Sequence, residues 1–143
     1  MHSNQSCTIA RSVSVPVVTI LSVVFEDGKS DGDAYAARAI LERRLGHRTQ
    51  LARILQHLGN AQLSSDNDLP IALNAAKIAI THLPVKEQGN PSHHFEAGLH
   101  NAKEEALLEL EELERLRQRY GNAAIRQRLA DIIDTFGRRL ARL

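Results

Sequence analysis

The clearest pattern of apolar and polar positions lies in the carboxy-terminal half of the chain. Between residues 93 and 120, and again between 123 and 143, apolar residues recur at spacings of three and four, which is typical of amphipathic helices packed as in a coiled coil. Only Gly121-Asn122 separates the two stretches. So short a break predicts a long antiparallel helical hairpin.

Two earlier stretches also carry the helical pattern. We expect one helix over about residues 34–58 with Gly46 inside it, or two coaxial pieces, because the apolar stripes on both sides of Gly46 are in phase. Gly59 is expected to end this helix. A second helix is expected over residues 69–83 and stops before Pro84. The predicted fold is therefore mostly α, a helical bundle built around the carboxy-terminal hairpin.

The segment Val17–Phe25 follows a different pattern. It is rich in β-branched residues, shows no helical period and begins directly after Pro16, so it predicts a strand that is mostly buried on both faces. Because no second strand is evident beyond a return strand over 13–15, this orphan strand requires a partner along its edges. We expect residues 1–11 to be a disordered terminus and residues 12–143 to form one domain.

The acidic stretch after this strand, VVFEDGKSDGD, raises the question of a calcium loop. A twelve-residue EF-hand loop that begins at Asp27 would need oxygen ligands at its third and twelfth positions, where this chain has Lys29 and Arg38. The acids are better explained by a turn at Asp27-Gly28 and by Asp31 or Asp33 capping the next helix.

Composition narrows the classes of function. The chain has 143 residues, of which 43 % are hydrophobic, 24 % charged and 3 % aromatic, so aliphatic residues must build the core. The net charge of +1 gives no overall attraction to nucleic acid or membrane. Cys7 is the single cysteine, which excludes an intrachain disulfide.

No membrane span is expected, because the longest nearly uncharged apolar run, residues 12–25, is shorter than the roughly 20 residues that cross a bilayer. Arg11 before this run and Ala34-Tyr35-Ala36 after it resemble parts of a signal peptide. Eight polar or glycine residues lie between the apolar run and this possible cleavage site, which argues against export by this segment.

Two clusters of residues offer alternatives with defined chemistry. His93, Glu96 and His100 lie at i, i+3 and i+7 of the predicted long helix, a spacing that predicts a divalent-metal site. Basic side chains concentrate on the first helix, which predicts a nucleic-acid or phosphate contact. These residues are Arg38, Arg43, Arg44, Arg48 and Arg53. No motif for a catalytic nucleophile accompanies either cluster.

The residues Val23-Val24-Phe25-Glu26-Asp27-Gly28, followed by Gly32-Asp33 and a helix with Arg44-x-Gly46, resemble a segment of bacterial proteins of unknown function that are often predicted to be exported. The resemblance covers roughly residues 17–58 and implies that the strand follows an amino-terminal all-β domain. It assigns no activity. Lys29 departs from the small hydroxyl residue usual at that position.

From these observations we expect a non-enzymatic structural or interaction protein with no cofactor, which associates with a second copy or a protein partner. The contacts would come from the hairpin face or from the strand, through Val17, Val18, Ile20, Val24 and Phe25. The localisation would be cytoplasmic for a complete chain and extracytoplasmic for a piece of the resembled family.

Overall fold

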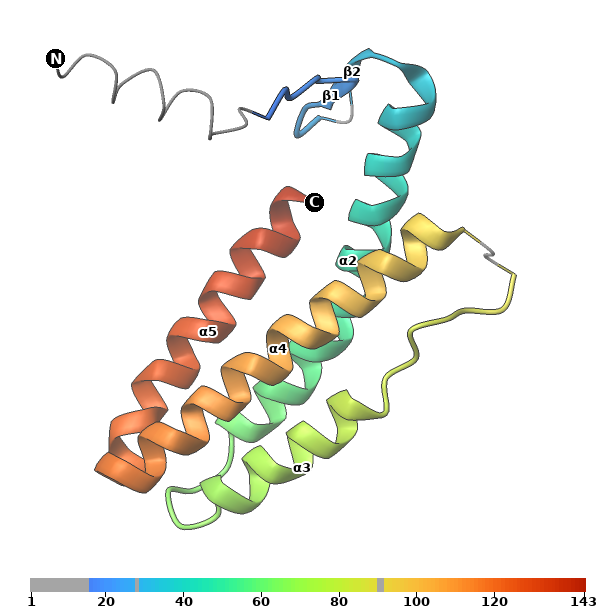
Figure 1. Cartoon of the computed structure of the whole chain (residues 1–143). Coiled ribbons are helices and arrows are strands. Elements are labelled where there is room, and N and C mark those ends of the chain that lie inside the picture. Colours follow the sequence, from blue (N-terminus) through green and yellow to red (C-terminus); the bar gives the residue numbers. More distant parts are fainter. Residues whose placement is uncertain (1–15, 28, 90–91) are drawn as a thin grey trace, which may run out of the picture.

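The computed structural model describes residues 16–27, 29–89 and 92–143. The predicted disordered stretch 1–11 and the suggested return strand at 13–15 lie outside these residues. The described residues form four helices and one two-stranded antiparallel sheet (Figure 1). The elements in chain order are β1 (Ser22–Val24), β2 (Ser30–Gly32), α2 (Ala34–Gln62), α3 (Leu69–Thr81), α4 (His93–Tyr120) and α5 (Asn122–Arg142). The expectation of a mostly helical protein is confirmed.

The helix ends follow local chemistry. The Asp33 carboxylate accepts a hydrogen bond from the Tyr35 amide at 2.9 Å and starts α2, and the Ser92 hydroxyl accepts one from the Phe95 amide at 3.3 Å at the start of α4. Gly121, at φ +89°, separates α4 from α5, a backbone conformation that favours glycine. The prediction that Gly59 ends the first helix is wrong, because its φ is not positive and α2 continues to Gln62.

The core lies between the helices. Both α2 and α4 pack against each of the other three helices, so these two long helices form the centre of the bundle (Figure 1). The apolar stripe of α4 is buried along its whole length, from Leu99 to Leu113. The amino-terminal half of α2 is less covered, and Leu41 and Leu45 of its stripe are exposed.

A pair of glycines sets the distance between α2 and α4. A Cβ atom on Gly46 would overlap the carbonyl oxygen of Phe95, and one on Gly98 would overlap the carbonyl oxygen of Arg43. Each glycine therefore faces the backbone of the other helix, and the two backbones cross at a separation that no side chain permits.

The amino-terminal strand differs from its prediction. Only Ser22–Val24 form strand β1, and these residues pair antiparallel with β2 in the register Val23↔Asp31. The strand is therefore not an orphan, because the turn after Phe25 folds the chain back at once: the Phe25 amide donates to the Lys29 carbonyl at 2.8 Å. The expected burial on both faces is also wrong, because of β1 only Val24 is buried.

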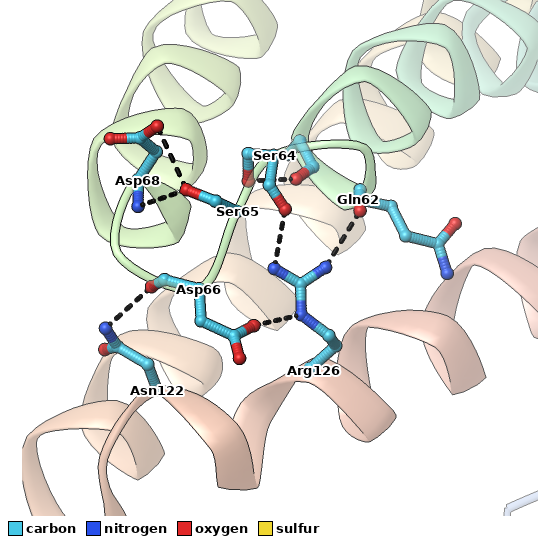
Figure 2. A network of polar contacts seen from close by, with 8 residues as sticks. Gln62, Ser64, Ser65, Asp66, Asp68, Asn122 and Arg126 are labelled. Atoms are coloured by element: carbon cyan, nitrogen blue, oxygen red, sulfur yellow. Dashed lines mark hydrogen bonds and ion pairs between the residues drawn. The ribbon is translucent and has the colours of Figure 1, made fainter.

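One guanidinium holds the loop between α2 and α3 against the start of α5 (Figure 2). Arg126 donates to the Asp66 carboxylate at 2.7 Å and to the Gln62 and Ser64 carbonyls at 2.8 Å each. The Asn122 amide also donates to the Asp66 carbonyl at 2.9 Å. These contacts satisfy carbonyls that the end of α2 would otherwise leave without partners.

The glycine crossing generates a stability prediction. We expect Gly46→Ala and Gly98→Ala each to lower the free energy of unfolding by about 1–3 kcal/mol, because the added methyl group meets backbone that cannot move aside. Gly59→Ala is the matched control: a Cβ there meets nothing within 4 Å, and alanine should stabilise the helix by about 0.5–1 kcal/mol. Urea denaturation measures all three; equal effects at the three positions would refute the close crossing.

The loop contacts generate a second prediction. Arg126→Met keeps most of the side-chain volume and removes the donors, so the free energy of unfolding should fall by about 1–3 kcal/mol. Arg115→Met is the control, since Arg115 on the surface of α4 pairs with Glu112 of the same helix and with no other described residue. Thermal denaturation of this variant should show little change. A loss for Arg126→Met no larger than for the control would contradict the assigned role.

Candidate functional site

A run of highly exposed apolar residues leads into the small sheet. Val17, Val18, Ile20 and Leu21 are between 63 % and 91 % exposed, and Val23 and Phe25 are also exposed. Of the predicted interaction residues, Val24 does not belong to this surface, because it is 7 % exposed and packs inward. We call residues Val17–Phe25, without Val24, the apolar segment. A contiguous apolar surface of this kind usually marks an interaction site.

The hydrogen bonds of the sheet show which edge of β1 is open. The Leu21 carbonyl accepts a hydrogen bond from the Asp33 amide, and the Phe25 amide donates one to the Lys29 carbonyl. These two backbone groups therefore face β2. Because backbone groups alternate along a strand, those of Ser22 and Val24 face the opposite edge. Arg44 of α2 donates to the Val24 carbonyl at 2.7 Å and to the Phe25 carbonyl at 2.8 Å. This arginine closes the edge at Val24, and no other described residue forms a hydrogen bond with that edge between Val17 and Ser22.

A cavity of about 410 Å³ lies beside the same arginine. Its walls come from the first half of α2, the start of α4 and the end of α5 with Leu143. Ala39, Ile40 and Leu143 supply the apolar lining. Positively charged or imidazole groups supply the rest: Arg43, Arg44, His47, His94 and Arg139. No Asp or Glu among the described residues lines the cavity.

His47 is the most unusual group of this cavity. Its Nε2 atom is shielded from solvent and meets no hydrogen-bond partner in the described part of the chain. Burial lowers the pKa of His47, an effect that Glu105 opposes and Arg139 reinforces through their charges. The imidazole is therefore neutral near pH 7 and presents an unsatisfied nitrogen inside the protein.

Most of the predicted nucleic-acid arginines have partners within the chain. Arg38 pairs with Glu42 at 3.6 Å, Arg53 pairs with Glu87, and Arg48 donates to the Leu143 carbonyl at 3.3 Å. Arg44 binds the two strand carbonyls described above. Arg43 alone of the five forms no ion pair or side-chain hydrogen bond with the residues that the structure describes. Four of the five side chains thus serve different contacts of the fold.

The predicted metal site is not formed. His93 Nδ1 lies 3.8 Å from the Glu96 carboxylate, but the His93 side chain is 96 % exposed. Seven residues of helix also separate His93 from His100, a rise of about 10 Å. Across the described ranges, no group of three histidine, cysteine or acidic residues is arranged to hold a metal ion.

Sequence reasoning named two of the cavity residues, Arg43 and Arg44, and missed His47, His94 and Arg139. These three lie on α2, α4 and α5, and no spacing along the chain relates them. The sequence feature that could have indicated this site is Gly46, next to His47. A glycine within a helix marks a place where another backbone can approach.

Comparison of the chain with known protein families, with curated proteins and with solved structures finds no match. The resemblance to exported bacterial proteins therefore stays a prediction. None of the helices in the described ranges is long and apolar enough to cross a membrane.

The burial of His47 generates a pH prediction. The pKa of a histidine is about 6.5 in the unfolded chain and is lower in the folded protein, so the unfolded state takes up a proton first as the pH falls. The contribution of His47 to stability is therefore complete above pH 6.5 and declines as the pH drops towards the folded pKa. Urea denaturation between pH 7.5 and about 5 should show this decline.

Two variants identify the source of the decline. His47→Gln should flatten the dependence of the unfolding free energy on pH, while His100→Gln should leave it unchanged, because His100 is exposed on the surface of α4. The same slope in wild type and His47→Gln would show that the buried imidazole is not responsible.

Proposed function

We propose that this protein is a non-enzymatic interaction protein that associates with a second copy of itself through the apolar segment. The observation that supports the proposal is the run of exposed aliphatic side chains that leads directly into strand β1. Exposed apolar surface and unpaired strand edges both favour association, and strand addition satisfies both at once.

The chemistry of the apolar segment supports a second copy as the partner. Residues 17–25 carry no charged side chain, so an antiparallel pair of identical segments buries apolar side chains against each other and brings no charge into the interface. A two-fold axis makes such a contact self-complementary and closed. The open stretch ends at Ser22, because Arg44 occupies the Val24 carbonyl. The axis would therefore lie near Ile20.

The surfaces of α4 and α5 are less suited to hold a partner than the apolar segment. Where α5 turns back at Gly121 and runs beside α4, the ion pairs Glu105–Arg139 and Glu109–Arg128 link the two helices. The apolar stripes of both helices are buried in the core. The apolar residues of α4 and α5 are thus used within the bundle, which supports the apolar segment as the surface for a partner.

The proposal is tested by oligomeric state. Light scattering coupled to size-exclusion chromatography should give twice the chain mass of 15.9 kDa at micromolar concentration. Val18→Lys places two like charges in the symmetric contact and removes two buried valines, worth about 1.5–3 kcal/mol each. The dimer dissociation constant should therefore rise by at least about 100-fold.

A matched variant shows whether the dimer depends on the apolar segment or on any exposed apolar side chain. Ile71 on α3 is also highly exposed, and Ile71→Lys should leave the dimer intact. A monomer at all concentrations would refute the second copy as the partner. A dimer that survives Val18→Lys but not Ile71→Lys would place the interface on α3.

A further inference from the structure

We infer that the cavity between α2, α4 and α5 binds a medium-chain aliphatic carboxylate. At about 410 Å³ the cavity has the size of a small-molecule site, for which roughly 300–1,000 Å³ is usual. The inference concerns a site distinct from the apolar segment and does not depend on the proposed dimer.

The charges around the cavity favour an anionic headgroup. Arg139 is neutralised by its ion pair with Glu105. Arg44 bonds to two neutral carbonyls, so its charge is not compensated by a carboxylate. Arg43 has no ion pair with any described residue and keeps its donors available. The nearest acid on the same helix, Glu42, already contacts Arg38 and the Ser92 hydroxyl.

The availability of donors favours one carboxylate over a phosphate group. Arg44 has committed both terminal nitrogens to backbone carbonyls, and Arg139 donates to Glu105. Arg43 is thus the one guanidinium of the lining with a free fork, which matches the two oxygens of a single carboxylate. His47 also lines the cavity, but its Nε2 is shielded from solvent, so the headgroup is assigned to Arg43 alone.

The remaining lining favours an aliphatic tail. Ala39, Ile40 and Leu143 are aliphatic, and no Phe, Tyr or Trp among the described residues lines the cavity. An unbranched alkyl chain fills such a space through apolar contact alone, which is worth about fourfold in affinity per buried methylene group.

The glycine crossing explains why the cavity exists in this place. Gly46 and Gly98 bring the two backbones together between Arg43 and His47, so the side chains on both sides of Gly46 are held beside the start of α4. His94 comes from that helix start and Leu143 from the end of the chain. The Leu143 carbonyl is fixed by Arg48 at 3.3 Å.

The experiment is a calorimetric titration of the full chain with hexanoate, octanoate and decanoate below their micelle concentrations. Affinity should rise about fourfold per added methylene group until the cavity is full. Octanol should bind at least tenfold more weakly than octanoate, because it lacks the charge that pairs with Arg43. Inorganic phosphate should give no heat.

Variants test the two ends of the site. Arg43→Gln should weaken octanoate binding by at least about tenfold and leave octanol binding unchanged. Ala39→Phe should abolish both by filling the apolar part. Arg38→Gln is the matched control, since Arg38 lies on the same helix, is exposed and does not line the cavity, and it should leave octanoate binding unchanged.

Several outcomes would overturn the inference. These are no binding of any of the three carboxylates, an affinity independent of chain length, competition by phosphate, or equal effects of Arg43→Gln and Arg38→Gln. Circular dichroism verifies the fold of each variant. If Ala39→Phe fails to fold, the chain-length series and Arg43→Gln still decide the question, because Arg43 is exposed and its replacement removes no core contact.

Discussion

The close approach of α2 and α4 is the constraint on which the rest of the structure depends. Two glycines, Gly46 and Gly98, each face the backbone of the opposite helix, so the helices cross with no side chain between them. Close packing of this kind leaves no room for adjustment. It holds α4 against α2, and these two helices carry the contacts to α3 and α5.

The same crossing also positions the residues that contact the amino-terminal sheet and line the cavity. Arg43 and Arg44 precede Gly46 on α2, and His47 follows it. Arg44 reaches the carbonyls at the end of β1 and also lines the cavity, together with Arg43 and His47. The amino-terminal sheet and the cavity are therefore positioned by consecutive turns of one helix. A change in the crossing would move both.

The polar contacts outside the core fix the connections between helices. Arg126 holds the α2–α3 loop to α5 (Figure 2), and Gln50, which is fully buried, donates to the Pro84 carbonyl at 2.9 Å after α3. A buried amide with satisfied donors specifies one arrangement of its neighbours. These polar contacts hold the connections between the helices in place.

The sequence by itself determined the helical character of the chain and the buried stripe of α4, and it limited the cap of the first helix to Asp31 or Asp33, because periodicity and capping are local properties of neighbouring residues. It did not determine that Val17 and Ile20 are exposed, since an aliphatic run predicts burial whether or not anything covers it. Only the tertiary structure decided that the strand pairs with β2, that Gly59 continues its helix, and that His47 and Arg139 meet in one cavity. These features depend on contacts between residues far apart in the chain, which no local spacing encodes.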